Sequence, residues 1–502
     1  KRYGVAFGVE FLCWCAIGYA LLLTKSRTAY AGGITAAGLL VCVTVFSVVR
    51  TLRGRLSVLV VMIVLTAGVG IGGYLTGGID RLVWEEAPKS LKYRMEYWQG
   101  AMGVIGEAPV FGTGPGQFRQ HYLKYKLPES SEEIVDPHNM LLDVWSNGGM
   151  IGLVGLIGIL GWVLWRGVKL GLRGVESSTN EMSSEGVDPV WNQMGWMLGV
   201  VGMLTMYVIG GGGDQELLMV GGVWLGLMLA GGIWLRGDDS GRSAEWGIIA
   251  LIGIGVHLLG NGGIGMPTVL IAFLSLLAMT VPTVAQEGAP EGRRLWMLIG
   301  WPVGWGVACL VFGALPVTNA SDLKESAKFA RTPESRLGLL RQGAEADRIA
   351  PDGWGDFSVA LTEEWLRQPK QRVAVYEQAL AAAEEAVRRD PYNGVRYRQA
   401  ASLMWYRARV EKDPSFALAA GEYFEKAIER SPTRADLIAD AAAAMELAGK
   451  GERSRELARK GLELDELNHQ AGHSDKYLPE KQVEELRKIV EGKQEPQPLS
   501  EK

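Results

Sequence analysis

Long apolar blocks alternate with polar connections along the first 317 residues, and this pattern predicts membrane-spanning helices. Crossing about 30 Å of hydrocarbon takes roughly 20 apolar residues. Nine blocks approach that length, near residues 3–23, 31–49, 56–77, 149–165, 194–212, 217–235, 247–262, 266–285 and 295–317. The seventh and eighth blocks can also be interpreted as a re-entrant hairpin, because only residues 260–267 separate their apolar runs.

From about residue 318 the pattern changes to amphipathic helical spacing. Segments 374–391, 421–432 and 453–465 place apolar residues on one helical face and end in similar stop signals. The interval from Pro432 to Glu466 is about the 34 residues of a tetratricopeptide repeat, whereas the preceding interval is longer. The chain is therefore expected to be all-α, with a transmembrane bundle in 1–317 and a tetratricopeptide-like (TPR-like) helical domain in 318–490. An unrelated helical bundle is the alternative for the tail.

Basic residues indicate the orientation of the bundle. They gather in alternate connections, which the positive-inside rule assigns to the cytoplasm. These residues are Lys1, Arg2, Arg50, Arg53, Arg55, Arg166, Lys169, Arg173, Arg236, Arg242, Arg293 and Arg294. The remaining connections, among them the long loop 78–148 and the whole tail, are then expected on the outer side of the membrane.

The remaining composition adds a few limits. The chain has 502 residues with 67 Gly, and its four Cys (Cys13, Cys15, Cys42 and Cys309) all lie within predicted spans. The tail therefore has no disulfide framework or zinc pattern, and we expect no nucleic-acid partner. No Met precedes Lys1, so we expect earlier spans to be missing. Residues 491–502 are expected to be disordered.

The loop 78–148 is the best place to look for chemistry, because a loop of this length in a membrane protein is usually functional. It contains a probable amphipathic helix at 91–107, the glycine-rich run FGTGPGQF at 111–118, and DPHNMLLDVWSNGG at 136–149. The glycine-rich run lacks the Lys-Ser/Thr of a nucleotide-binding P-loop, and no strand precedes it. Its Gly112, Gly114 and Gly116 instead favour a tight turn, or backbone N–H groups close to a phosphate.

Three ionisable side chains are the strongest candidates for a reaction at the outer surface. Arg27 lies at the outward end of the first visible span, and Arg94 lies in the predicted helix. One guanidinium group can bind two phosphate oxygens at once, so both residues suit a lipid-linked pyrophosphate. His138 can accept a proton from a hydroxyl near neutral pH, and Asn139 can orient the ring or a sugar hydroxyl. Ordinary roles remain open for all of them, as span anchors for the arginines and as a solvated loop residue for the histidine.

Metal-binding spacing is absent from the outward loops. No Asp-x-Asp pair or His/carboxylate cluster occurs there, and the acidic pair Asp238 and Asp239 falls on the expected cytoplasmic side. We therefore expect no metal and no cofactor, with arginines neutralising any bound pyrophosphate.

Together these segments resemble the superfamily of O-antigen ligases, O-antigen polymerases and protein O-oligosaccharyltransferases. The resemblance rests on TKSRTA, on Arg94 followed by Trp98, on the pattern from Pro109 to Phe118, and on DPHN before a Gly-Gly span entry. It covers roughly residues 1–235, with residue 285 as its outer limit. The chain departs from the family after the HN pair, where Asp143 is followed by the neutral WSNGG, and in having fewer spans.

The resemblance implies a multi-pass glycosyltransferase of the bacterial inner membrane that needs no metal. It would take a glycan from undecaprenyl pyrophosphate and pass it to a lipid, glycan or protein hydroxyl, with Arg27 and Arg94 on the donor pyrophosphate and His138 as base. The competing hypothesis is a non-enzymatic membrane anchor or transporter that displays the repeat domain, in which these three residues need not converge. The tail is expected to recruit an acceptor or another assembly protein.

Overall fold

The computed structural model describes residues 26–48, 87–176, 240–280, 307–369 and 372–492, with a few isolated positions between them. Every regular element in these ranges is helical and none is a strand, which confirms the all-α class for this part of the chain. The predicted spans 3–23, 56–77, 194–212 and 217–235 lie outside the described residues, as does nearly all of the expected disordered tail.

The chain divides into two compact units. The first contains Lys1–Phe118 and Val135–Gly288, and the second contains Arg119–Ile134 and Ala289–Lys502. The long loop is thus shared: its middle, Arg119–Ile134, packs with the tail, whereas both of its ends belong to the first unit.

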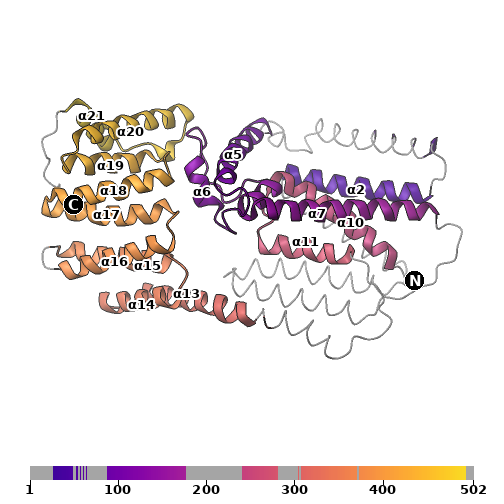
Figure 1. The fold of residues 1–502 in the computed structure, drawn as a ribbon, viewed down its shortest axis with the longest axis horizontal. Helices are drawn as coiled ribbons and strands as arrows, with labels where there is room; N and C mark the ends of the chain where they lie inside the picture. The colour runs from indigo at the N-terminus through magenta and orange to yellow at the C-terminus, as the bar shows by residue number, and fades with distance from the viewer. Residues whose placement is uncertain are drawn as a thin grey trace. The chain divides into compact units, whose positions relative to one another are not determined.

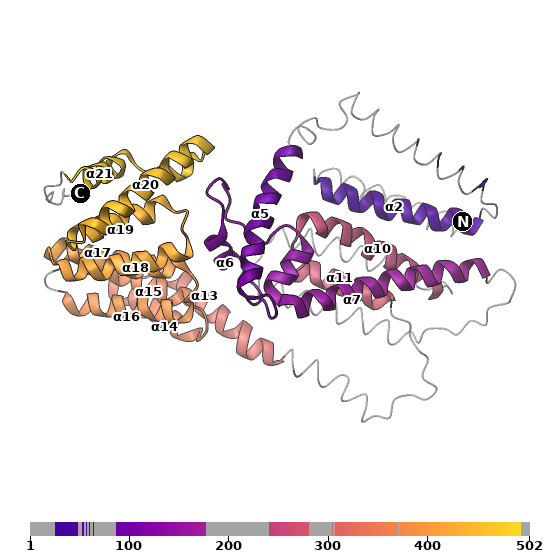
Figure 2. The ribbon, with the colours of Figure 1, turned by 45° about the horizontal axis from the view of Figure 1, so that its top comes forward.

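In the first unit, four helices lie side by side: α2 (Arg27–Val48), α7 (Met140–Glu176), α10 (Ser240–Asn261) and α11 (Pro267–Thr280). Helix α5 (Ala87–Glu107) crosses the end of this group at a steep angle (Figures 1 and 2). The helix predicted at 91–107 is therefore confirmed, with a start four residues earlier. The paired runs at 247–285 form α10 and α11, joined by the short turn between Asn261 and Pro267.

Helix α7 contains the strongest candidate for a membrane span in the described part of the chain. Its stretch Met140–Lys169 is long and apolar enough to cross a bilayer, whereas the apolar parts of α10 and α11, Gly247–Asn261 and Val269–Ala278, are shorter. Large apolar side chains are exposed along it, as a lipid-facing surface requires: Ile151, Val154, Ile157, Leu164, Trp165 and Val168. The full set of nine spans remains a prediction.

Glycines bring α2 and α10 into close contact. A Cβ on Gly32 would lie 2.5 Å from the carbonyl oxygen of Gly253, and one on Gly253 would lie 2.9 Å from Cβ of Ala36. Such small-residue contacts allow backbones to approach where apolar lipid supplies no driving force for association. The α2–α10 pair is thereby fixed tightly, and its ends carry part of the candidate site.

The glycine-rich run packs against a break in α7. Gly149 has φ 66° and ψ −169°, which interrupts the helix. The exposed N–H of Met150 is donated to the carbonyl of Pro109 (2.9 Å), and the carbonyls of Ser146 and Asn147 accept from Thr113 and Gly114 (2.8 and 3.0 Å). The backbone groups freed by the break are therefore satisfied by the loop, as buried backbone groups generally are.

In the second unit, the helices after residue 314 form a stack in chain order, which we call the helical stack (Figure 1). The helices of this stack are α13 (Leu315–Lys328), α14 (Pro333–Ala346), α15 (Asp352–Arg367), α16 (Val373–Arg389), α17 (Gly394–Glu411), α18 (Pro414–Arg430), α19 (Ala435–Leu447), α20 (Gly451–Ala471), η3 (Ser474–Lys476) and α21 (Glu480–Glu491). The unit also contains η2 (Leu310–Ala314) and, from the long loop, α6 (Phe118–Tyr125). The helices predicted at 374–391, 421–432 and 453–465 are confirmed as α16, α18 and α20. Residues 317 and 318, the expected domain boundary, lie inside α13.

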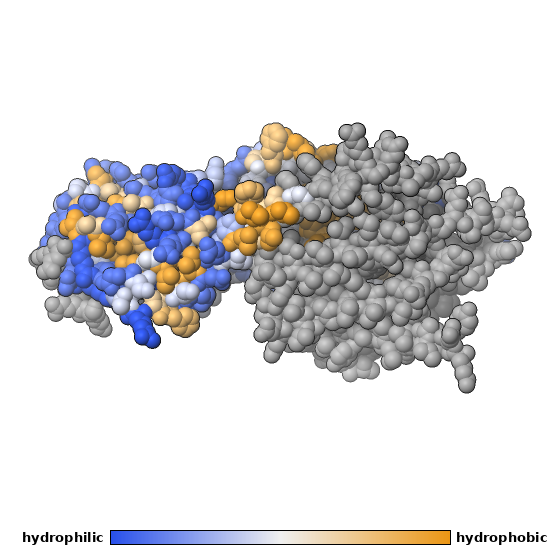
Figure 3. Space-filling view, turned by 90° about the horizontal axis from the view of Figure 1, so that it is seen from below, coloured by the Kyte–Doolittle hydropathy of each residue, from blue (hydrophilic) through white to orange (hydrophobic). Residues whose placement is uncertain are grey.

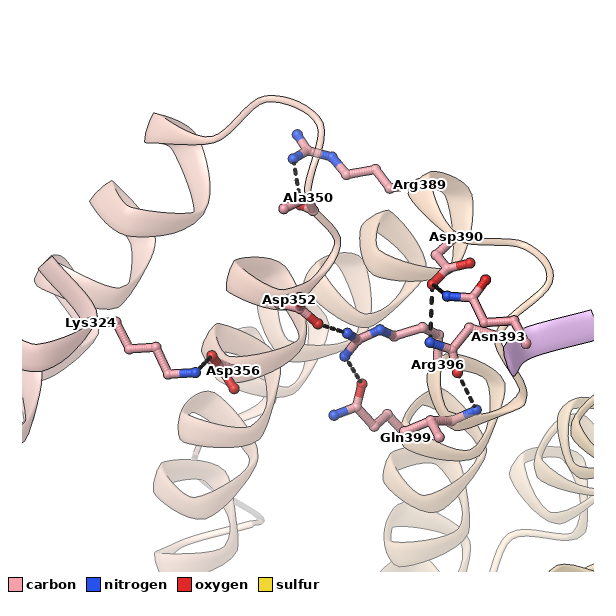
Figure 4. Close-up of polar contacts among 11 residues, drawn as sticks. Lys324, Ala350, Asp352, Asp356, Arg389, Asp390, Asn393, Arg396 and Gln399 are labelled. Atoms are coloured by element: carbon pink, nitrogen blue, oxygen red, sulfur yellow. Dashed lines mark hydrogen bonds and ion pairs between the residues drawn. The ribbon is translucent and has the colours of Figure 1, made fainter. Parts of the chain in front are cut away.

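Alanine-rich faces let these helices approach one another, and polar bonds fix their register. Ser358 donates to the carbonyl of Ala379, joining α15 to α16, and Ser454 donates to that of Ala442, joining α19 to α20 (both 2.8 Å). The buried guanidinium of Arg396 pairs with Asp352 and donates to Gln399 (Figure 4). The face of the stack seen in Figure 3 is mostly hydrophilic. Its tetratricopeptide character remains a prediction.

Candidate functional site

The segment Asp136–Asn139 forms a tight polar turn immediately before α7. Oδ1 of Asp136 accepts the backbone N–H of His138 (2.7 Å) and lies 3.1 Å from Nδ1 of its ring. His138 has φ 50°, a left-handed conformation that is uncommon for a residue with a side chain. One carboxylate oxygen thus holds both the strained backbone and the imidazole, and such strain is often found at functional positions.

The end of α10 supports this turn from below. Gly262 has φ +62°, and a Cβ there would lie 2.1 Å from Oδ1 of Asp136 and 2.9 Å from Cα of His138. No residue other than glycine fits this position without displacing the turn. The backbone of Asn261 also lies close enough to His138 to raise the pKa of its imidazole.

Helix α5 presents three residues of one face, Arg94, Tyr97 and Trp98, to the same turn. Trp98 donates its indole N–H to the carbonyl of Pro137 (3.0 Å), and the ring of Tyr97 meets that of His138 edge-on at 5.8 Å between centroids. The charge of Arg94 acts on His138, so its guanidinium lies within electrostatic range of the imidazole. The sequence pattern of Arg94 and Trp98 therefore reflects one helix face, on which Trp98 bonds to the turn and Arg94 places a positive charge near it.

The beginning of α2 reaches the same end of α10. A Cβ on Gly260 would lie 2.6 Å from Cγ2 of Thr28 and 4.0 Å from Nη1 of Arg94. Arg27 is the first residue of α2, and Ser26 caps the helix by accepting the N–H of Ala29 (3.3 Å). Arg27 thus directly precedes Thr28, which packs against Gly260 close to Arg94. The side chain of Arg27 lies outside the described atoms.

The environment of His138 raises its pKa above the ordinary value of 6.5. The hydrogen bond with Asp136 is the largest cause, and the negative charge of Asp136 and the backbone of Asn261 act in the same direction. Burial and the positive charge of Arg94 oppose them. The imidazole is therefore a stronger base than a free histidine, and its protonated form persists to higher pH.

Asn139 has a structural role that the sequence interpretation did not assign. Its Oδ1 accepts the N–H groups of Leu141 and Leu142 (3.0 and 3.2 Å), which makes it the N-cap of α7. An Asn directly before an apolar helical run is a recognisable capping signal. The predicted contact of Asn139 with a sugar hydroxyl remains a prediction, and its carbonyl oxygen is already engaged.

The glycines of the 111–118 run serve close packing. Gly112, Gly114 and Gly116 all have positive φ, as a tight turn requires. A Cβ on Gly112 would lie 2.4 Å from the backbone of Asn147, and the N–H of Gly114 is donated to the carbonyl of Asn147. The N–H of Gly114 is thus engaged within the protein. A phosphate contact at Gly114 or Gly116 remains a prediction.

Asp143, the acidic residue after the HN pair, is buried in the first turn of α7. Its Oδ1 accepts from Nδ2 of Asn147 (2.8 Å), and its Oδ2 lies 4.0 Å from the Cβ position of Gly265. A carboxylate is favoured at a helix N-terminus. Asp143 therefore links the break in α7 to the α10–α11 turn.

Two groups of the site went unrecognised in the sequence. Asp136 is the partner of His138, and its position two residues before the histidine, with a proline between, was a usable signal for an Asx turn. The contribution of Asn261 and Gly262 had no local signal, because these residues come from a distant connection. In the described part of the chain, no group of three or more His, Cys, Asp and Glu side chains is arranged to hold a metal ion.

The described atoms thus bring Arg94, His138 and the start of α2 to one end of α10. Residues 11–157 match the O-antigen ligase family. This O-antigen ligase-like domain includes Arg27, Arg94, Gly114, Gly116, His138 and Asn139, whereas α10, α11 and the helical stack lie beyond the match. No curated protein matches the chain. The similarity is confined to this part of the chain and supports an O-antigen ligase-like domain there.

Proposed function

We propose that this protein is a membrane glycosyltransferase that moves a glycan from undecaprenyl pyrophosphate to an acceptor hydroxyl at the outer face of the bacterial inner membrane. The observation that carries the proposal is the meeting of Arg94, His138 and the first turn of α2 at Gly260–Gly262. The first three of these lie within the residues that match the O-antigen ligase family, whereas Gly260–Gly262 lie beyond them. An anchor or transporter gives no reason for this convergence.

The reaction is an inverting displacement at the anomeric carbon. The acceptor oxygen forms the new bond to that carbon and loses its proton to His138, while the bond to the pyrophosphate oxygen breaks and the pyrophosphate takes the electron pair. Arg27 and Arg94 neutralise the charge that grows on the leaving group, without a metal ion. Two helices, α2 and α7, begin at the site, and their positive ends also favour an anion there.

His138 has a second possible role, which its contacts favour. The carboxylate of Asp136 and the backbone of Asn261 both stabilise the imidazolium. In that form His138 would bind the pyrophosphate as a cation and would not accept a proton. The two roles predict opposite pH dependences, because a base must be deprotonated and a phosphate-binding cation must be protonated.

The decisive experiment is reconstitution with a lipid-linked glycan and candidate acceptors, with product identified by mass. His138→Ala is expected to lower the turnover by about 10² to 10⁴-fold, and Arg94→Ala by about 10² to 10³-fold. Lys92→Ala is the matched control, since Lys92 is an exposed cation on the same helix. Full activity in both site variants would refute the assignment. No transfer by the wild type with any lipid-linked donor would favour the anchor.

The acceptor is a lipid, a growing glycan or a protein hydroxyl, and the same assay distinguishes them by the product formed. The pH profile of kcat separates the two roles of His138. Activity that rises with pH through the raised pKa supports the base, and activity that falls through it supports the cation. The helical stack is the proposed contact for an acceptor or a partner protein.

A further inference from the structure

The middle of the long loop, Arg119–Ile134, is held by the helical stack; we call it the clasped segment. At its start, Gln120 donates to Oδ2 of Asp390 (3.0 Å), and the ring of His121 lies against that of Tyr392 with 4.7 Å between centroids. Asp390 is itself braced by Nδ2 of Asn393 (3.0 Å; Figure 4). These contacts join residues about 270 positions apart in the sequence.

The end of the clasped segment is held at a second turn of the stack. The ammonium of Lys476 donates to the carbonyls of Ser130 (3.3 Å) and Ser131, and Ser130 is only 1% exposed. Between these points, the charge of Glu133 acts on Arg434 at a third turn.

All three turns connect one pair of helices to the next: α16 to α17, α18 to α19, and α20 to α21. Connections of this kind recur at the same edge of a stack of helical hairpins. The clasped segment therefore follows one edge of the stack. Its buried residues Tyr122, Lys126 and Ile134 show that it is packed in and not merely apposed.

Both ends of the clasped segment lead directly into the candidate site. Phe118 precedes it at the end of the glycine-rich run, and Asp136 follows Ser131 by five residues. Five residues span at most about 17 Å, so the carbonyl of Ser131 and the polar turn of Asp136 and His138 are joined by a short stretch of chain.

We propose that Lys476 is a positioning residue for glycan transfer, which holds the chain that leads into His138 through the carbonyls of Ser130 and Ser131. This inference rests on the proposed function. It gives the helical stack a task besides recruitment, because the stack completes the loop of the O-antigen ligase-like domain.

The experiment compares Lys476→Met, Lys476→Arg and the control Lys460→Met in the full-length protein; Lys460 is an exposed lysine of α20. Hydrogen exchange reports the opening of 119–134 separately from the core of α17–α19. Exchange is measured at pH 9, because Lys126, whose pKa Lys476 helps to lower to about 7, is neutral there and gains nothing from the substitution. Loss of charged hydrogen bonds should then accelerate exchange of the segment by about 10 to 100-fold in Lys476→Met, with the α17–α19 core unchanged. The kcat for transfer should fall at least about tenfold, and Lys476→Arg should restore most of both.

Each result is informative. An opened segment with unchanged kcat would overturn the positioning role, and a segment that stays protected in Lys476→Met would overturn the clasp itself. If the wild type transfers no glycan, the proposed function fails, while the exchange data still decide whether Lys476 holds the loop. A higher KM for the acceptor with an unchanged kcat would assign Lys476 to recruitment and would also refute the proposal.

Discussion

Lys126 makes the clasped segment sensitive to pH. Its side chain is 6% exposed, and burial, followed by the hydrogen bond and the charge of Lys476, lowers the pKa of Lys126 from 10.5 to about 7. The nearby charges of Glu133 and Asp475 oppose this only in part. When the segment opens, Lys126 becomes an ordinary lysine again and takes up a proton at neutral pH.

The magnitude follows from the distance between the two pKa values, about 3.5. Each pKa unit corresponds to about 1.4 kcal/mol, so the clasp is weakened by roughly 3 to 5 kcal/mol after allowance for partial screening by water. Above pH 10.5 Lys126 is neutral in both states and the penalty is absent. It grows as the pH falls from 10.5 to about 7, and is complete below about 7, where both states bind the proton.

The assay is hydrogen exchange of residues 119–134 between pH 6 and 9, corrected for the intrinsic exchange rate at each pH. In the wild type, the opening constant should fall about tenfold per pH unit from pH 7 to 9 and be flat below 7. Lys126→Met should remove the slope and give greater protection at pH 6 to 7, whereas Lys460→Met should behave as the wild type. The same slope in Lys126→Met would refute the reasoning.

Three further predictions concern the site. Gly262→Ala should lower the turnover in the glycan-transfer assay by about 10²-fold, because the added Cβ displaces Asp136 and His138. The control Gly263→Ala should retain activity, because Gly263 also has a positive φ but its Cβ position meets only the Met266 side chain, at 3.6 Å. Equal activities of the two variants would contradict this prediction. Gly149→Ala should destabilise the fold by about 2 to 4 kcal/mol through its clash with the carbonyl of Val110, seen in thermal melting, and Gly148→Ala, with open space around it, by under about 1 kcal/mol. Asp136→Asn should lower the pKa of His138, so the pH profile of kcat should move to lower pH; an unmoved profile would separate His138 from the observed titration.

Local signals in the sequence were sufficient for the helices. The amphipathic spacing of 374–391 and 453–465 survives in the structure as α16 and α20, because their buried alanine and leucine stripes need no information from elsewhere. The choice of Arg94 and His138 also depended on local context, and the structure brings the two within electrostatic range.

Long-range contacts were beyond local reading. The turn 260–267 was interpreted only as a separator between apolar runs, yet Gly260 and Gly262 support Thr28, Arg94 and the polar turn. The clasped segment was interpreted as part of one outward loop, although its partners lie about 270 to 346 residues away. A single sequence does not show whether a glycine packs against a residue distant in the sequence, because a short connection between helices also favours glycine for its backbone conformation.

The site combines closely packed glycines at the end of α10 with a strained turn at His138. The glycines at the end of α10 fix the distance between α2, α5 and the polar turn, since they leave no free volume under Asp136 and His138. The strain at His138 is held by the bonds of Asp136, and Gly262 and the bond from Trp98 to Pro137 support the same turn. The chain before the turn leads into the clasped segment, so a change at the clasp acts on the strained turn through a short connection. For this reason we expect the helical stack to influence turnover more than donor binding, which Arg94 on the rigid helix α5 can sustain without it.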